Sequence, residues 1–221
     1  MTDRAPYRLI RSRAAASEFH ARTVPEPAPC EIWHHEVTAP ALVLGSSQSE
    51  AVVDTAACAS AGVEVVRRRS GGGAVLLVPG EVTWIDVIVP ARSPGWSDDV
   101  HGPMLWLGRH LVAAMAELCD EPLAVHDGAM QTTSWSSMIC FDGLGAGEVT
   151  MAGRKLVGIS QRRTRLAARL QCCWYSAYRP TELLALLDAA VRPPAHALGP
   201  VATVPSEIAE ALPSALLDRL R

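Results

Sequence analysis

Three arginines and three glycines stand together in the stretch VVRRRSGGGAVLLVPGEVTW, residues 65–84, between two apolar, strand-like runs. Glycine lets a ligand approach the backbone closely, and Gly71–Gly73 provide three such positions in a row. Side chains alternate across a strand, so at least one of Arg67–Arg69 must point inward, where a buried guanidinium needs a partner. A carboxylate or phosphate on a ligand would supply that partner, which predicts a binding loop. The alternative is a hairpin whose turn is rich in glycine and whose arginines face water.

Other motifs that could carry chemistry are absent. Neither of the phosphate-binding patterns G-x-x-x-x-G-K-[ST] and G-x-G-x-x-G occurs. The chain has six cysteines, no two of them in C-x-x-C spacing, and seven scattered histidines, so we expect no metal site. Free thiols are expected rather than disulfides, with the two adjacent cysteines, Cys172 and Cys173, pointing to opposite faces of a strand.

The elements that must position these residues can be predicted from the apolar pattern. We expect strands at 41–45, 63–68, 74–78, 82–89, 137–141, 148–151, 155–160 and 167–174. We expect helices at 49–61, capped by Ser49, at 97–119, at 181–190, capped by Thr181, and at 206–221. Because strands arrive in runs instead of alternating with helices, the predicted fold is α+β, a mixed and mainly antiparallel sheet packed with helices.

Composition limits the class of protein. The chain has 221 residues, 49% hydrophobic and 19% charged, with a net charge of −3, which is typical of a globular protein and argues against a nucleic-acid or membrane-surface role. We expect residues 1–192 to form the functional domain. We expect residues 193–221, a Pro-rich linker and a C-terminal helix, to be part of the same domain. No apolar run is long enough to span a bilayer, and the charged first 20 residues do not resemble a signal peptide. A cytoplasmic location is therefore expected.

At this point three segments resemble a known family. RRRSGGGAV followed by GEVTW is similar to the signature of lipoate–protein ligase A and the octanoyltransferases, which share a catalytic fold with biotin–protein ligases. GRKLVGISQRR, residues 153–163, resembles the lysine-bearing segment of that family. ALVLGSSQSEAVVDTAACASAGVEVVRR resembles the stretch that leads into the glycine-rich loop, so that the resemblance covers roughly residues 40–175.

The resemblance implies an enzyme that moves a lipoyl or octanoyl chain onto a lysine of a lipoyl domain. It implies that Lys155 contacts the acyl carbonyl or the acyl-adenylate oxygen, where a cation stabilises developing negative charge. The glycine-rich loop would line the acyl tunnel. The acyl- or adenylate-binding residues it implies are Arg68, Arg69, Ser70, Gly71, Gly72, Gly73, Ala74, Gly158 and Ser160. Without the motif, Lys155 would be read as a solvated residue beside a hairpin turn.

The family includes ATP-dependent ligases and transferases that work through a cysteine thioester. Three paired positions of the ligases, His-Asp, Asn-Asp and His-Gly, are replaced here by Leu77-Val78, Gly147-Glu148 and Gln171-Cys172. The segment CFDGLGAGEVTMAGRK, residues 140–155, instead resembles the cysteine octanoyltransferases, although their Pro-Ser is here Leu144-Gly145. This resemblance makes Cys140 the nucleophile, with Lys155 as the cation that would lower the thiol pKa. The alternatives are that Cys140 is a small core residue, or that Cys172 or Cys173 takes its place.

The expected substrates and partners follow from this choice. A transferase would take octanoate or lipoate from an acyl carrier protein and give it to a lipoyl-domain acceptor. A ligase would use free lipoate with ATP and Mg²⁺, and could need a separate small accessory subunit. A third possibility is a catalytically silent relative that only binds the carrier.

Overall fold

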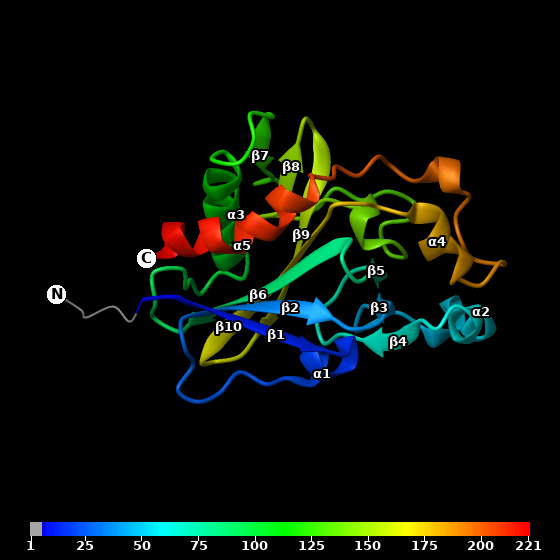
Figure 1. Ribbon diagram of the computed structural model, residues 1–221, viewed down its shortest axis with the longest axis horizontal. Coiled ribbons are helices and arrows are strands. Elements are labelled where there is room, and N and C mark those ends of the chain that lie inside the picture. The colour runs from blue at the N-terminus through cyan, green and yellow to red at the C-terminus, as the bar shows by residue number, and fades with distance from the viewer. Residues whose placement is uncertain (1–5) are drawn as a thin grey trace.

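A seven-stranded sheet runs through the molecule, in the order β1-β2-β6-β10-β9-β8-β7 (Figure 1). β1 is parallel to β2, and all the other neighbours in this sheet are antiparallel. The computed structural model describes residues 6–221. The strands of this sheet are β1 (Arg8–Ala14), β2 (Glu31–Val37), β6 (Val82–Pro90), β7 (Leu123–Val125), β8 (Val149–Met151), β9 (Arg154–Arg163) and β10 (Ala167–Tyr175). The predicted α+β class with a mainly antiparallel sheet is confirmed.

A second, three-stranded sheet faces the large one. Its order is β4-β3-β5, with β3 (Ala41–Leu44) parallel to β4 (Glu64–Arg67) and antiparallel to β5 (Val75–Leu77). The glycine-rich segment connects β4 to β5. Because β4 and β5 are the two edges of this sheet, the segment crosses the end of β3. It then meets η2 (Cys140–Asp142), a short 3-10 turn, through the bridge between Ala74 and Ile139.

The two faces of the large sheet have different partners. On β6 and β10, the side chains of Ile85, Val87, Leu170 and Trp174 are buried in a core shared with α3 (Gly102–Met115) and α5 (Ser206–Leu220). The alternate residues of the same strands point to the opposite face, toward the small sheet and α1 (Ala16–Ala21). The space between the two sheets is thus walled by strands on both sides.

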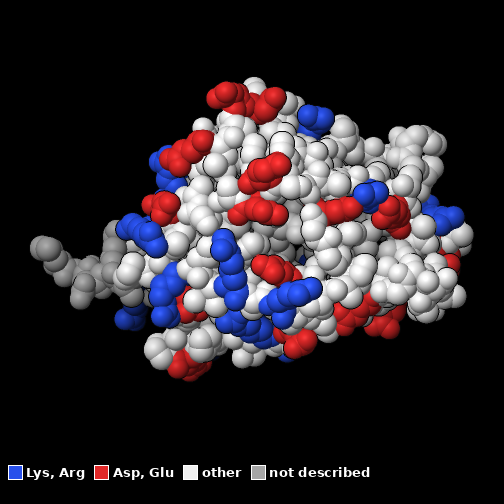
Figure 2. Space-filling model, in the orientation of Figure 1, with Lys and Arg blue, Asp and Glu red and all other residues white. Residues whose placement is uncertain are grey.

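β1 forms one edge of the large sheet and carries three arginines, Arg8, Arg11 and Arg13. In the view of Figure 2, basic side chains gather over this part of the molecule. Charged side chains on an edge strand oppose pairing with another chain, so β1 is protected from edge-to-edge association.

Several predicted elements differ from the observed ones. The helix expected at 49–61 is broken into η1 (Glu50–Val52) and α2 (Thr55–Ser60), because Val53 leaves the helix to bridge Leu187. The strand expected at 137–141 is wrong, since only Ile139 makes a bridge before the chain turns into η2. The Thr181 cap is also wrong: α4 (Pro180–Ala185) begins one residue earlier, with its proline at the first position. The expected helix at 97–119 is shorter, Gly102–Met115.

The proline-rich segment after α4 is docked onto the sheet through backbone hydrogen bonds. The N–H of Ala202 donates to the carbonyl of Lys155 at 2.8 Å, and the N–H of Val204 donates to Tyr175 at 3.1 Å. Both residues are buried in the same core as α5. Between residues 6 and 221, no helix is both long and apolar enough to cross a membrane.

Candidate functional site

Arg68 folds the glycine-rich loop onto itself. Its guanidinium is buried and donates to the carbonyls of Gly71 and Gly73, both at 2.8 Å. The buried guanidinium therefore finds its partner in backbone carbonyls, and not in the ligand anion that the sequence suggested. Arg67 faces outward to Glu50, and Arg69 is exposed.

Gly73 of this loop is required by the closeness of the Cys140 segment, and Gly72 is required by its backbone conformation. A Cβ on Gly73 would come within 2.6 Å of the Cys140 nitrogen and the Ile139 carbonyl carbon. A Cβ on Gly72 would lie 3.7 Å from the Cys140 sulfur, and Gly72 has a φ of +102°, which disfavours other residues. The loop and Cys140 are thus in contact through backbone.

Lys155, on β9, reaches across to the same segment. Its ammonium lies 2.7 Å from Glu148 Oε2 and donates to the carbonyls of Cys140 and Gly143, both at 2.9 Å. These three partners match the three N–H donors of the group. The ammonium also lies 5.0 Å from the centre of the Phe141 ring. Lys155 therefore fixes the turn that carries Cys140.

Burial alone would lower the pKa of Lys155, but the Glu148 carboxylate beside it, with a further contribution from Cys140, raises the pKa above its ordinary value. The lysine is consequently a stable cation in this site. Glu148 is held in turn by the backbone N–H groups of Gly145, at 2.7 Å, and Ile159, at 3.0 Å. The carboxylate has a partner on each oxygen.

An apolar cavity lies between the two sheets. Its apolar walls come from β3, β5, β6 and β9, through Val43, Val75, Leu77, Trp84 and Ile159. The side of Cys140 and the face of Gly158 complete the lining.

A larger, more polar cleft lies outside this cavity. It is lined by Gly71–Gly73, Lys155 and Glu148 on one side, and by Asp99 and Asp127 from surface loops on another. Cys140, Ile159 and Ser160 line both the cleft and the cavity. The glycines therefore face the cleft, whereas the apolar cavity beside them is walled mainly by strand side chains. Cys140 stands where the two spaces meet.

A chain of polar groups lies along the cavity wall. The hydroxyl of Ser70 is 2.9 Å from that of Ser160 and donates to Gln171 Oε1 at 3.1 Å. Gln171 Nε2 is 3.5 Å from His20 Nδ1, and the His20 ring stacks on Trp84 with centroids 4.6 Å apart. Burial lowers the pKa of His20 to about 4, so its imidazole is neutral near pH 7.

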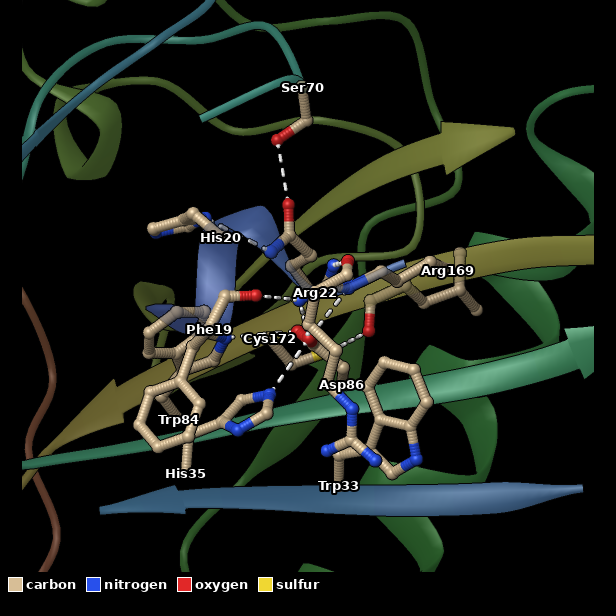
Figure 3. A network of polar contacts seen from close by, with 12 residues as sticks. Phe19, His20, Arg22, Trp33, His35, Ser70, Trp84, Asp86, Arg169 and Cys172 are labelled. Atoms are coloured by element: carbon tan, nitrogen blue, oxygen red, sulfur yellow. Dashed lines mark hydrogen bonds and ion pairs between the residues drawn. The ribbon is translucent and has the colours of Figure 1, made fainter. Parts of the chain in front are cut away.

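A buried ion pair supports the floor of the site (Figure 3). Arg169 Nε donates to Asp86 Oδ2 at 2.7 Å, and His35 Nε2 lies 2.9 Å from the same oxygen. Trp84 Nε1 donates to Asp86 Oδ1 at 3.0 Å, which orients the indole that lines the cavity. Burial would raise the pKa of Asp86, but His35 and Arg169 together hold it at about 2. Asp86 is thus an anion with partners on both oxygens.

The two other candidate cysteines have environments that oppose a thiolate. Cys172 is fully buried in the core with α3 and α5, and burial raises its pKa well above the ordinary value. Burial, with a contribution from Cys140, raises the pKa of Cys173 to about 12. A protonated thiol is a poor nucleophile, so neither Cys172 nor Cys173 is suited to nucleophilic attack.

The residues present do not fit a magnesium ion beside the lysine. Glu148 stands where the ligases carry Asn-Asp, and both its oxygens are already used. The position comparable to the ligase His-Asp pair includes Leu77, which is part of the apolar cavity wall. Across residues 6–221, no group of three His, Cys, Asp or Glu side chains is arranged to hold a metal.

The structure brings most of the predicted site residues together. Cys140, Lys155, Gly71–Gly73 and Ser160 line the cleft, and Arg68, Gly158 and Ser160 line the cavity. Ala74 pairs with the Cys140 segment by backbone, while Arg69 lies outside both linings. The sequence reading missed His20, Trp84 and Gln171. The polar residues at alternate positions of the apolar strand 167–175, Arg169 and Gln171, were a signal that this face is not core.

Comparison with known proteins agrees with this geometry. The octanoyltransferase LipM of Carboxydothermus hydrogenoformans is 35% identical over 127 residues, which is 57% of this chain and 45% of LipM. The match thus spans less than half the length of that relative. Two solved structures share the fold: lipoate-protein ligase A bound with ATP (TM-score 0.68, 17% identity, 98% of this chain and 86% of that chain), and the bi-partite lipoate protein ligase of Thermoplasma acidophilum studied with its E2 lipoyl domain (TM-score 0.68, 14% identity, 98% and 84%).

A family model extends this match over most of the chain. Residues 12–204 match the lipoyl protein ligase A/B catalytic domain. That match includes the glycine-rich loop, Cys140 and Lys155, so the residues that build the cleft and the cavity all lie inside it. The chain belongs to the lipoyl protein ligase A/B catalytic domain family.

Proposed function

We propose that this protein transfers an octanoyl or lipoyl group from a carrier thioester to a lysine of a lipoyl domain, through a thioester on Cys140. The observation that carries the proposal is the position of Cys140 at the junction of an apolar cavity and an open polar cleft, in contact with the glycine-rich loop. The likeness to an octanoyltransferase and the poor fit of the site to magnesium support transfer over ligation.

In the first step the Cys140 thiolate attacks the carbonyl carbon of the donor thioester. A carbon–sulfur bond to Cys140 forms, the bond to the carrier sulfur breaks, and the carrier leaves as a thiolate. The Lys155 ammonium stands beside the turn that carries Cys140 and donates to the Cys140 carbonyl at 2.9 Å. In the second step the neutral amine of the acceptor lysine attacks the Cys140 thioester. An amide forms, Cys140 is released as a thiolate, and the amine proton passes to solvent.

Negative charge on the carbonyl oxygen needs donors in both steps. All three N–H donors of Lys155 already have partners, so contact with the acyl oxygen requires one carbonyl bond, to Cys140 or Gly143, to be exchanged. The N–H groups of Gly71, Gly72 and Gly73 donate to no group among residues 6–221, and they line the same cleft. The proposed oxyanion site therefore combines loop N–H groups with the field of Lys155.

The apolar cavity accounts for the acyl substrate. A chain of eight carbons has seven CH₂ or CH₃ groups to remove from water, each contributing about 0.8 kcal/mol on burial. We propose that the chain lies along Val43, Val75 and Leu77 with its carbonyl at Cys140. A cytoplasmic location belongs to the same proposal, because all six cysteines are free, as a reducing compartment would keep them.

The test compares acylation of one acceptor from two alternative acyl donors. Purified protein is given a lipoyl-domain acceptor with either an octanoyl carrier thioester, or free lipoate, ATP and Mg²⁺. Acylation of the acceptor only from the thioester is the expected result. Acylation only from lipoate and ATP would make the protein a ligase, and binding of the carrier without acylation from either donor would make it a silent relative.

A further inference from the structure

A groove lined by four arginines lies between the segment that follows α1 and the turn from β9 to β10. The arginines are Arg22, Arg162, Arg165 and Arg169, and the single acid in its lining is Glu26. The groove has an empty volume of about 1140 Å³. Such an excess of one sign is unexpected in a chain whose net charge is −3.

Two of these four arginines have side chains without a partner within the described chain. Arg169 is committed to Asp86, and the Arg22 guanidinium stacks over Trp33 at 3.6 Å from the ring centre. Outside the β9–β10 ladder, the side chains of Arg162 and Arg165 make no hydrogen bond or ion pair with any of residues 6–221. Burial, Arg69 and Arg169 all lower the pKa of Arg162, which reflects a cation surrounded by other cations.

The groove adjoins the reaction cavity along one face of the sheet. Ser160 pairs with Gln171 in the register of β9 and β10, and Arg162 pairs with Arg169 two residues further on. Two residues of strand span about 7 Å, and residues two apart point to the same face. Arg69, next to Ser70, brings a further cation to the same end of the cavity. The arginines therefore begin where the polar wall of the cavity ends.

We propose that this arginine groove docks an acidic face of the carrier protein that delivers the acyl thioester, an inference that rests on the function proposed above. Guanidinium groups recognise carboxylates and phosphodiesters through paired hydrogen bonds, and charge complementarity steers such a partner into place. The acceptor lysine carries the opposite charge. It presents a lysine ammonium, which the arginines repel and which Asp99 and Asp127 of the outer cleft attract. The two substrates thus approach Cys140 from differently charged sides.

The test reverses the charge of the two unpartnered arginines, Arg162→Glu with Arg165→Glu. The control is Arg219→Glu with Arg221→Glu on α5, which produces the same change in net charge on the opposite face of the sheet. Each protein is assayed with an octanoyl carrier protein and with octanoyl N-acetylcysteamine, a thioester without protein or phosphate. We expect the KM for the carrier donor to rise on the order of 10-fold in the groove variant alone, and the KM for the small thioester to stay unchanged in both variants.

Three results with the groove variant would overturn the proposal. The KM for the carrier donor could stay unchanged, the KM for the small thioester could rise equally, or the KM for the lipoyl-domain acceptor could rise in place of that for the carrier. If the wild-type protein turns over neither thioester, the transferase function fails, and docking is then judged by carrier binding alone. In that assay the wild type and the α5 variant must bind the carrier in a salt-dependent way, and the groove variant must bind it on the order of 10-fold more weakly.

Discussion

At the scale of single residues, the site depends on how two charges are buried together. Lys155 and Glu148 are each less than a tenth exposed, and each has all its hydrogen-bonding atoms engaged. A resemblance between motifs identifies the lysine but says nothing of this pairing. The proposed chemical role of Lys155 is therefore coupled to a structural one, and a single substitution at this position would change both.

Lys155→Ala is expected to lower the turnover number by about 10²–10³ and also to lower the free energy of unfolding by about 3–5 kcal/mol, because Glu148 is left buried without its partner. The double variant Lys155→Met with Glu148→Gln removes both charges and should recover most of the stability while staying inactive. Urea unfolding and steady-state acyl transfer measure the two effects. A double variant that regains activity with stability would show that Lys155 acts only through the fold.

At the scale of elements, the β4–β5 loop and η2 must approach each other through backbone. The matched pair Gly73→Ala and Gly71→Ala tests this approach. A Cβ on Gly73 meets backbone at 2.6 Å, whereas a Cβ on Gly71 meets nothing within 4 Å. Because a displacement of about 1 Å in a catalytic group can cost about 10²-fold in rate, we expect that loss in Gly73→Ala and near-normal turnover in Gly71→Ala. Equal rates in the two variants would contradict the contact.

The element scale also shows what the sequence can predict. The strands at 82–89 and 167–174 are predicted because both segments are rich in apolar and β-forming residues, and the order of motifs along the chain pairs Cys140 with Lys155. The apolar cavity could not be predicted, since its walls come from seven separate elements and the glycine-rich loop, which only the two-sheet packing brings together. Arg68 was expected to need a ligand because a sequence does not show which carbonyls a loop will turn inward.

At the scale of the whole molecule, buried titratable groups make stability depend on pH. His20 has a folded pKa of about 4, below the ordinary value of about 6.5, so the unfolded chain binds its proton first as the pH falls. Its contribution is complete above pH 6.5 and is lost toward pH 4, on the order of 2–3 kcal/mol. Asp86, held at about 2, loses its contribution only below about pH 4.

His20→Phe keeps a ring against Trp84 but cannot titrate. We expect the wild type to lose more stability than this variant between pH 7 and pH 4.5, and both to lose stability alike below pH 4. Urea midpoints at pH 7, 4.5 and 3 measure the difference. Equal losses of stability in the two proteins between pH 7 and 4.5 would mean that His20 is not the titrating group. Burial also lowers the pKa of His34, and this histidine is present in both proteins as an internal reference.

The central claim is that Cys140 carries the acyl group. A single turnover of the wild-type protein with an octanoyl carrier thioester, quenched in acid and followed by peptide mass spectrometry, tests it most directly. If the thioester forms on Cys140, the peptide that contains this residue carries one octanoyl group. This adduct should be removed by hydroxylamine, form and decay at least as fast as turnover, and be absent from Cys140→Ser. A wild-type protein that never forms this adduct, yet acylates a lipoyl domain when given lipoate and ATP, would contradict the account and make Cys140 a structural residue.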